Sequence, residues 1–163
     1  MRSKKTLFIT EAAAIAAIYT VLVVIFQLTS FGPIQFRIAE ALTILPYFTP
    51  AAIPGVTIGC FLSAILTSAP PIDMIFGSLA TLIAAFLSYK LRKHKFLVPI
   101  PPIVLNTLII PWVLRYAYEI PDSIPFMMLT VGVSEFLVVG IIGMVLLFAL
   151  DAVKHVVFRN GTV

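Results

Sequence analysis

The stretch QFRIAEALTILP at residues 35–46 places a full positive and a full negative charge inside a chain that is otherwise apolar. Its charged residues, Arg37 and Glu40, are three positions apart. In a helix this spacing puts both side chains on one face, where Thr43 continues the same stripe. Moving either charge into hydrocarbon costs about 2.5–3.5 kcal/mol, so ionisable residues in membrane segments usually face a bundle interior or a watery cavity. The stretch therefore predicts a buried polar site.

This charged pair has two interpretations. In the first, Arg37 and Glu40 form an intrahelical ion pair near the membrane interface, and the Arg37 side chain extends to water. In the second, Glu40 accepts hydrogen bonds from a polar ligand while Arg37 orients that ligand. We favour the second interpretation, in which the rest of the chain houses the site.

The composition indicates the class of protein. The chain has 163 residues, of which 61% are hydrophobic and 11% charged, and its mean hydropathy is +1.11. Such values lie far outside those of soluble globular domains and indicate an integral membrane protein. A spanning helix needs about 20 mostly apolar residues, so the chain has room for about five to seven spans and no separate soluble domain. We expect an all-α integral membrane protein in which residues 1–163 form a single domain.

Prolines, glycines and charges divide the chain into six apolar segments, so we predict six transmembrane helices. They lie at about residues 7–28, 35–46, 54–67, 73–89, 99–116 and 126–153. The fifth helix should be irregular, because Pro99, Pro101 and Pro102 deny it a regular first turn and Pro111 kinks it. Interrupted helices of this kind often mark a substrate path.

The distribution of basic residues predicts the orientation in the membrane. If both termini are cytoplasmic, the inside collects nine of the 11 Lys and Arg residues, in agreement with the positive-inside rule. The outer half then contains Arg37, Glu40, Asp73, Arg115, Glu119, Asp122 and Glu135. We expect Arg115, Glu119 and Asp122 at the solvated interface. The remaining four charges are not explained by topology.

Three of the candidate site residues lie outside the first stretch. Asp73 follows Pro70-Pro71 and can either cap the fourth helix or contact a ligand. Asn106 can hydrogen-bond to a neighbouring helix or to a ligand. Glu135 lies about ten residues, or about 15 Å of helical rise, into the last helix, which is too deep for easy solvation from its end. The predicted substrate-binding residues are Arg37, Glu40, Asp73, Asn106 and Glu135.

Small residues mark a second feature of the first helix. Ala12, Ala13, Ala16 and Ala17 form pairs four positions apart, which let another helix approach closely. That helix can belong to this subunit or to a partner membrane protein, and the sequence leaves both possibilities open.

Several classes of function lack their motifs in this sequence. No glycine-rich phosphate loop ends in Lys-Ser or Lys-Thr, and no serine-nucleophile elbow or His-Glu-x-x-His pair appears, so we expect neither an ATP site nor catalytic residues. The lone Cys60 and the absence of a Cys/His cluster argue against an internal disulfide, a metal or another cofactor. The basic residues flank apolar runs and form no patch for nucleic acid. The chain therefore fits a solute-capturing subunit without a motor of its own.

Three runs in the chain resemble a known family. They are QFRIAEALTILPYFTPAAIPGVTIGC at 35–60, IDMIFGSLATLIAA at 72–85 and PPIVLNTLI at 101–109, followed by a glutamate in the last helix. Together they resemble the queuosine-precursor transporter (QueT) family, whose members are substrate-binding S components of energy-coupling factor (ECF) transporters.

The resemblance implies a fold, a location and partners. It implies the six-helix ECF S-component fold in a prokaryotic plasma membrane, with solute captured from outside. It also implies a transmembrane T component and two cytoplasmic ATPase subunits, which supply the hydrolysis. In that larger group, small residues on the first helix dock onto the T component, and Ala12 and Ala16 fit this role, with Ala13 and Ala17 as the adjacent pair.

The implied solutes are queuosine precursors, which carry a deazaguanine ring. One carboxylate can accept both the N–H and the amino group of a guanine-like edge, and a carboxamide such as that of Asn106 can pair with the ring carbonyl. An aminomethyl substituent makes the solute cationic, and a second carboxylate then becomes useful. The sequence leaves open which carboxylate meets which part of the solute. Two other interpretations also remain, namely an S component for another vitamin-like solute and a scaffold membrane protein whose charges merely pair.

Overall fold

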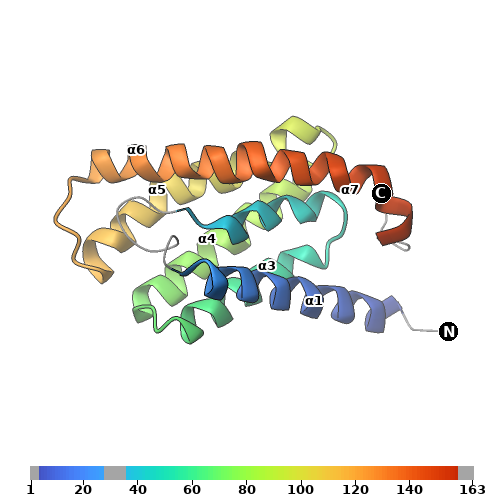
Figure 1. The fold of residues 1–163 in the computed structure, drawn as a ribbon, viewed down its shortest axis with the longest axis horizontal. Coiled ribbons are helices and arrows are strands. Elements are labelled where there is room, and N and C mark those ends of the chain that lie inside the picture. The colour runs from blue at the N-terminus through green and yellow to red at the C-terminus, as the bar shows by residue number, and fades with distance from the viewer. Residues whose placement is uncertain (1–3, 28–35, 158–163) are drawn as a thin grey trace.

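The computed structural model describes residues 4–27 and 36–157, with side chains as far as Lys154. Within these residues every regular element is a helix. The helices are α1 (Lys4–Ile25), η1 (Ile38–Tyr47), α3 (Ala52–Leu66), α4 (Pro71–Lys90), the short η2 (Lys95–Leu97), α5 (Ile100–Ala117), α6 (Ile124–Glu135), η3 (Phe136–Gly143) and α7 (Met144–Val157). Since α6, η3 and α7 form one continuous rod, the described chain has six main helices (Figure 1). The all-helical prediction is confirmed.

Four of the described helices are long and apolar enough to cross a membrane. They are Lys4–Ile25, Pro71–Lys90, Lys95–Ala117 and Ile124–Lys154, while η1 and α3 are apolar but shorter. Large apolar side chains cover the outside of the bundle; Ile9 and Leu129, for example, are 66% and 65% exposed. A surface of this kind suits lipid rather than water. The chain is therefore a multi-pass membrane protein, and the count of six spans stays a prediction.

The short helix η1 lies at the centre of the bundle. It contacts α1, α3, α4, η3 and α7, and its residues from Ala39 to Tyr47 are all buried. Figure 1 shows η1 between α1 and the rod formed by α6 and α7. The same view shows that α1 begins and α7 ends at one end of the molecule, so the bundle has a terminal end and an opposite end.

The geometry of η1 differs from an ordinary α-helix. It is a 3₁₀ helix of 10 residues, although such helices rarely exceed three or four residues. Its rise of about 2.0 Å per residue lets it span about 20 Å, against about 15 Å for an α-helix of equal length. Pro46 has no N–H, so η1 lacks one backbone hydrogen bond near its end in either helix type. A 3₁₀ helix has three residues per turn, so Glu40 and Thr43 lie one above the other. The predicted polar stripe is therefore present, but it arises from 3₁₀ geometry and not from an α-helix.

The prediction for α5 was wrong at its first turn. The helix begins regularly at Ile100, with Pro101 and Pro102 in the first turn, and it continues through Pro111 to Ala117. Prolines are tolerated there because the first N–H groups of a helix have no intrahelical acceptor in any case.

The irregular helix is the last one instead. Its central segment, η3, has π-helical hydrogen bonding between the α-helical segments α6 and α7. Gly143 brings η3 close to η1, since a Cβ at that position would lie 3.2 Å from Cγ2 of Ile44. Segments of π-helix inside α-helices are frequent at functional sites. This segment directly follows Glu135.

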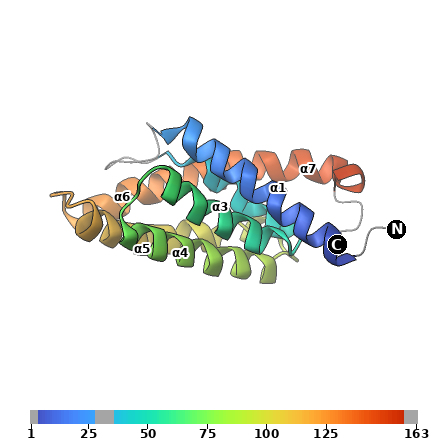
Figure 2. The ribbon, with the colours of Figure 1, turned by 90° about the horizontal axis from the view of Figure 1, so that it is seen from below.

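Glycines in α3 allow it to pack closely against α1, which lies across it (Figure 2). A Cβ added at Gly59 would lie 2.7 Å from Cβ of Tyr19 and 2.9 Å from the carbonyl oxygen of Ala16. A Cβ at Gly55 would lie 3.0 Å from the carbonyl oxygen of Ala12. All of these neighbours are backbone or Cβ atoms, which cannot rotate away.

The four alanines of α1 divide between two faces. Ala12 and Ala16 are buried, at 9% and 5% exposure, on the face that meets α3. Ala13 and Ala17 are exposed. Of the two possibilities that the sequence left open, packing within the subunit accounts for the first pair, and only the second pair faces outward.

We predict that Gly59→Ala destabilises the protein by about 1–3 kcal/mol, because the added methyl group forces α1 away from α3. Thermal unfolding in detergent measures the change. Gly140→Ala is the matched control, since its Cβ would meet only side-chain atoms, the nearest at 3.3 Å. Equal stability of the two variants would contradict the close packing of α1 on α3.

Candidate functional site

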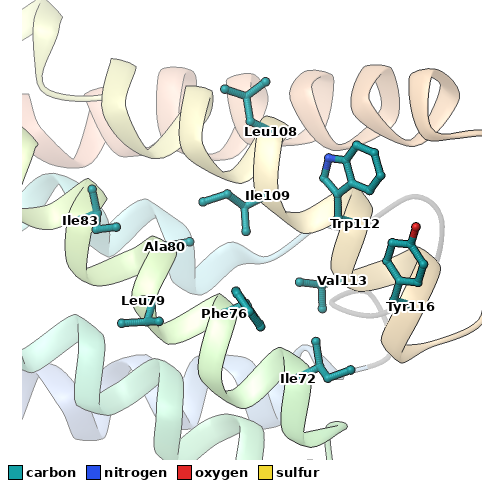
Figure 3. A pocket seen from close by; sticks show the side chains of 10 residues that line it. All are labelled: Ile72, Phe76, Leu79, Ala80, Ile83, Leu108, Ile109, Trp112, Val113 and Tyr116. Atoms are coloured by element: carbon teal, nitrogen blue, oxygen red, sulfur yellow. The ribbon is translucent and has the colours of Figure 1, made fainter.

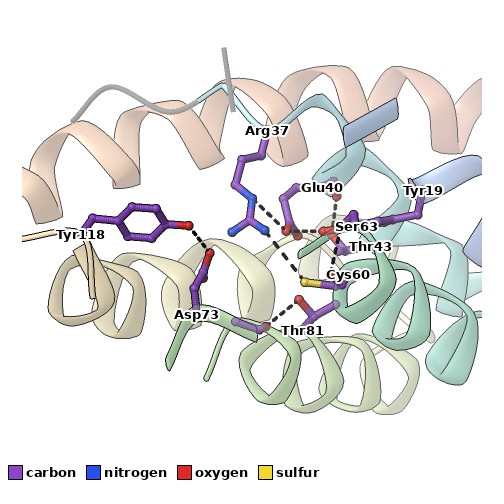
Figure 4. A network of polar contacts seen from close by, with 10 residues as sticks. Tyr19, Arg37, Glu40, Thr43, Cys60, Ser63, Asp73, Thr81 and Tyr118 are labelled. Carbon is purple, nitrogen blue, oxygen red and sulfur yellow. Dashed lines mark hydrogen bonds and ion pairs between the residues drawn. The ribbon is translucent and has the colours of Figure 1, made fainter. Parts of the chain in front are cut away.

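The structure brings the five predicted site residues together in the half of the bundle opposite the termini. The side chain of Arg37 is 10% exposed, and Glu40, Asp73, Asn106 and Glu135 are all buried. They come from four elements: η1 and the residue before it, the first turn of α4, the middle of α5 and the end of α6. Figure 4 shows Arg37 beside Glu40, and the carboxylate of Asp73 directed toward Tyr118.

Arg37 and Glu40 form a loose ion pair. Nε of Arg37 lies 3.9 Å from Oε1 of Glu40, which is longer than a charge-assisted hydrogen bond. The hydroxyl of Tyr19 donates to the same Oε1 at 2.7 Å. Nε of Arg37 and Oε2 of Glu40 are buried without a hydrogen-bond partner. The ion pair therefore leaves one buried polar atom of each side chain without a hydrogen bond from the described residues.

The guanidinium of Arg37 points into the cluster rather than to solvent. Its Nη2 lies 3.9 Å from Sγ of Cys60, within hydrogen-bonding range for sulfur (Figure 4). The hydroxyl of Ser63 donates to the carbonyl oxygen of Cys60 at 2.8 Å. Next to the pair, Thr43 donates to the carbonyl oxygen of Glu40 at 2.6 Å. The contacts of Glu40 with Tyr19 and of Arg37 with Cys60 tie the cluster to α1 and α3.

Asp73 is not a helix cap in this structure. The N-cap of α4 is Pro70, and no side chain caps that helix. Instead, Oδ2 of Asp73 accepts a hydrogen bond of 2.6 Å from the hydroxyl of Tyr118, which follows α5. Burial, and next the bond to Asp73, raise the pKa of Tyr118 above its usual range, so the phenol stays a donor. Asp73 also acts electrostatically on Arg37.

Glu135 and Asn106 form the far side of the cluster. Both side chains are buried, Asn106 lies near the Glu135 carboxyl group, and Glu40 and Arg37 act electrostatically on that group. Oε2 of Glu135 is buried without a partner. Two acidic residues, Glu40 and Glu135, therefore each keep one unsatisfied oxygen in the same polar interior.

Sequence reasoning missed three residues of the cluster. Tyr19, Cys60 and Tyr118 each contact a charged site residue through a hydroxyl or thiol group. For Tyr19 a signal existed, since it lies well inside an apolar helix, away from the interfaces where tyrosine usually occurs. Cys60 and Tyr118 gave no such signal.

Other polar residues do not join the cluster. Arg115 and Glu119 are exposed at the end of α5 and in the turn that follows it, and Arg115 donates to the carbonyl oxygen of Ile120 at 3.0 Å. In the part of the chain that the structure describes, no three His, Cys, Asp or Glu side chains are gathered so as to hold a metal ion.

A groove of about 660 Å³ lies on the outside of the bundle, between α4 and α5 (Figure 3). Its lining is almost wholly apolar and includes Phe76, Trp112 and Tyr116. No charged side chain lines it. Since a polar solute needs hydrogen-bonding partners, we place the functional site at the buried polar cluster and not in this groove.

We predict that Tyr19→Phe lowers the free energy of unfolding by about 1–3 kcal/mol, because it leaves Oε1 of Glu40 without its close donor. Denaturation in detergent measures the change. Tyr116→Phe removes the same hydroxyl at a side chain that is 68% exposed, and it should change stability by less than about 0.5 kcal/mol. A similar loss in both variants would argue against a specific Tyr19–Glu40 bond.

Comparison with known proteins gives the same assignment. The model of the QueT transporter family matches residues 9–152. A protein named Queuosine precursor transporter QueT, from Lactococcus lactis subsp. cremoris (strain MG1363), is 42% identical over 85 residues, which are 51% of this chain and 50% of that relative. The alignment thus spans about half the length of the curated relative, and no solved structure is significantly similar to the chain. Because the family model extends over most of the sequence, the chain belongs to the QueT transporter family, which consists of transporters and not of enzymes.

Proposed function

We propose that this protein is the substrate-binding S subunit of an ECF-type importer, and that its buried polar cluster captures a queuosine precursor or a related deazaguanine. The candidates are queuine and the aminomethyl and cyano precursors. The observation that carries the proposal is a pair of buried carboxylate oxygens, on Glu40 and Glu135, for which the described residues supply no hydrogen-bond partner. Leaving such a group unsatisfied costs about 1–3 kcal/mol, so a site that keeps two of them favours a ligand that supplies donors.

The chemistry of a deazaguanine fits this arrangement. Its guanine-like edge presents an N–H and an amino group side by side, and one carboxylate accepts both in a bidentate arrangement. Glu40 suits this role, since Tyr19 and η1 fix its carboxylate while Oε2 stays unsatisfied. Asn106, which lies near Glu135, has two donors and one acceptor to offer. Arg37 is then placed to hold a carbonyl oxygen of the ring.

The architecture completes the proposal. We infer that residues 1–163 form one six-span domain of the S-component type in a prokaryotic plasma membrane, with both termini cytoplasmic. The helix α4 ends at Lys90, and three more basic residues follow it closely, namely Arg92, Lys93 and Lys95. Basic residues of this kind are typical of the cytoplasmic side, which supports a cytoplasmic location for the end of the bundle that carries the termini. The polar cluster then lies in the outer half, where it meets solute from outside. The partners are a T component and two ATPase subunits, which supply the ATP hydrolysis for which this chain has no phosphate loop.

The docking surface for the T component belongs to the exposed face of α1. Ala13 and Ala17 present small side chains there, and small residues let a partner helix approach closely. Ala12 and Ala16 are covered by α3, so in this proposal they support α1 from within rather than touch the partner.

The test of solute capture is calorimetry with the purified protein and the three deazaguanines. We expect the wild type to bind at least one of them, and Glu40→Gln to weaken that binding by about tenfold or more, because an amide has only one acceptor oxygen for the ring edge. Glu119→Gln, at an exposed carboxylate, is the control and should bind normally. If no deazaguanine binds, the vitamin-like solute becomes the better assignment.

The test of docking is uptake by cells that contain the partner subunits. We predict that Ala17→Trp reduces uptake strongly while binding of the solute to the purified subunit stays normal, because the bulky ring blocks the approach of the T component. The control is Leu129→Trp, which adds the same ring on the exposed side of α6. Normal uptake with Ala17→Trp would remove this face of α1 from the docking surface.

A further inference from the structure

Glu135 carries a buried acidic group for which the described part of the chain supplies no close counter-ion. The residue is 5% exposed, and its Oε2 has no hydrogen-bond partner. Its neighbour Asn106 is neutral, and the two charged residues that act on it, Glu40 and Arg37, have opposite signs. The acidic group of Glu135 thus has no cation of its own among the described residues.

Arg37 does not fill this gap, because it is already shared. It lies 3.9 Å from Glu40, its Nη2 contacts Cys60, and it also interacts with Asp73. The cluster contains three acidic residues, Glu40, Asp73 and Glu135, and one cationic residue, Arg37. The adjoining residues 28–35 contain no Lys, Arg or His in the sequence. Among the described residues, the cluster therefore has an excess of acidic side chains over cationic ones.

A cationic solute corrects this excess. An ammonium group carries three donors and one positive charge, and it matches an acidic oxygen that is buried, oriented and unpaired. Burial strengthens such a contact, because the surrounding medium screens it less than water does. A neutral substituent at the same place would leave Oε2 of Glu135 unsatisfied and would gain no charge pairing.

We propose that Glu135 is the counter-ion for an amine on the solute, so that the protein selects deazaguanines with a protonated amine over neutral deazaguanines that share the ring. This inference rests on the proposed function, in which Glu40 reads the ring edge. According to this inference, Glu40 and Glu135 have different roles in binding. Glu40 is needed for any deazaguanine, whereas Glu135 is needed only for a cationic one.

The experiment measures binding of the aminomethyl and the cyano deazaguanine to the purified wild type, Glu135→Gln and Glu40→Gln. We expect the wild type to bind the aminomethyl base at least about tenfold more tightly than the cyano base, as for a charge-assisted contact. Glu135→Gln should lose most of that preference while binding the cyano base within about threefold of the wild type. Glu40→Gln should weaken binding of both bases. Thermal unfolding of each variant verifies that it is folded.

Each outcome bears on the inference. A wild type that binds the cyano base as tightly as the aminomethyl base overturns it, whatever the variants do, and leaves the proposed function standing. Equal weakening of both bases by Glu135→Gln also overturns it, because Glu135 would then not act on the amine. If neither base binds to the wild type, this inference fails, and if queuine does not bind either, the proposed function fails with it.

Discussion

The burial of the Glu40 carboxylate is the constraint on which the rest of the structure depends. Glu40 is 1% exposed and lies in the central helix of a chain with mean hydropathy +1.11. Water cannot reach such a group from the side of the bundle, so protein groups have to replace it. Tyr19 on α1 and Arg37 before η1 do so from two directions. The carboxylate thereby fixes how α1 lies against η1.

Departures from regular helix geometry serve this arrangement. The 3₁₀ geometry of η1 makes a short segment longer than an α-helix of equal residue number. It also aligns polar residues that are three positions apart more closely than an α-helix would. The π-helical segment η3 follows directly after Glu135 and packs against η1 at Gly143. Both irregular elements thus meet at the polar interior. In α5, by contrast, Pro101 and Pro102 lie in the first turn, where a helix tolerates proline, and the helix continues through the interior Pro111.

The sequence predicted the class of fold and the members of the site better than it predicted their geometry. Charged residues in apolar segments are few, and their burial is costly, so Arg37, Glu40 and Glu135 stood out. Tyr19 was overlooked, although a tyrosine this far inside an apolar helix is a signal, and Cys60 gave none because cysteine is common in apolar cores. The helix type of η1 was not predictable, since polar residues three apart fit an α-helix as well as a 3₁₀ helix. That of η3 was not predictable because the segment is apolar on every side and carries no periodicity. The two faces of the alanine pairs were likewise decided only by the glycines of α3.

The helix α1 links the polar site to the outer surface. One face of α1 carries Tyr19, which holds Glu40, and the same face packs on Gly59 with no room for even a methyl group. The other face exposes Ala13 and Ala17. Because the contact at Gly59 involves Cβ and backbone atoms, α1 cannot shift along α3 without moving the Tyr19 hydroxyl relative to Glu40. Any force that displaced α1 from its exposed face would therefore disturb the hydrogen bond between Tyr19 and Glu40, so this helix couples the outer surface to the buried polar cluster.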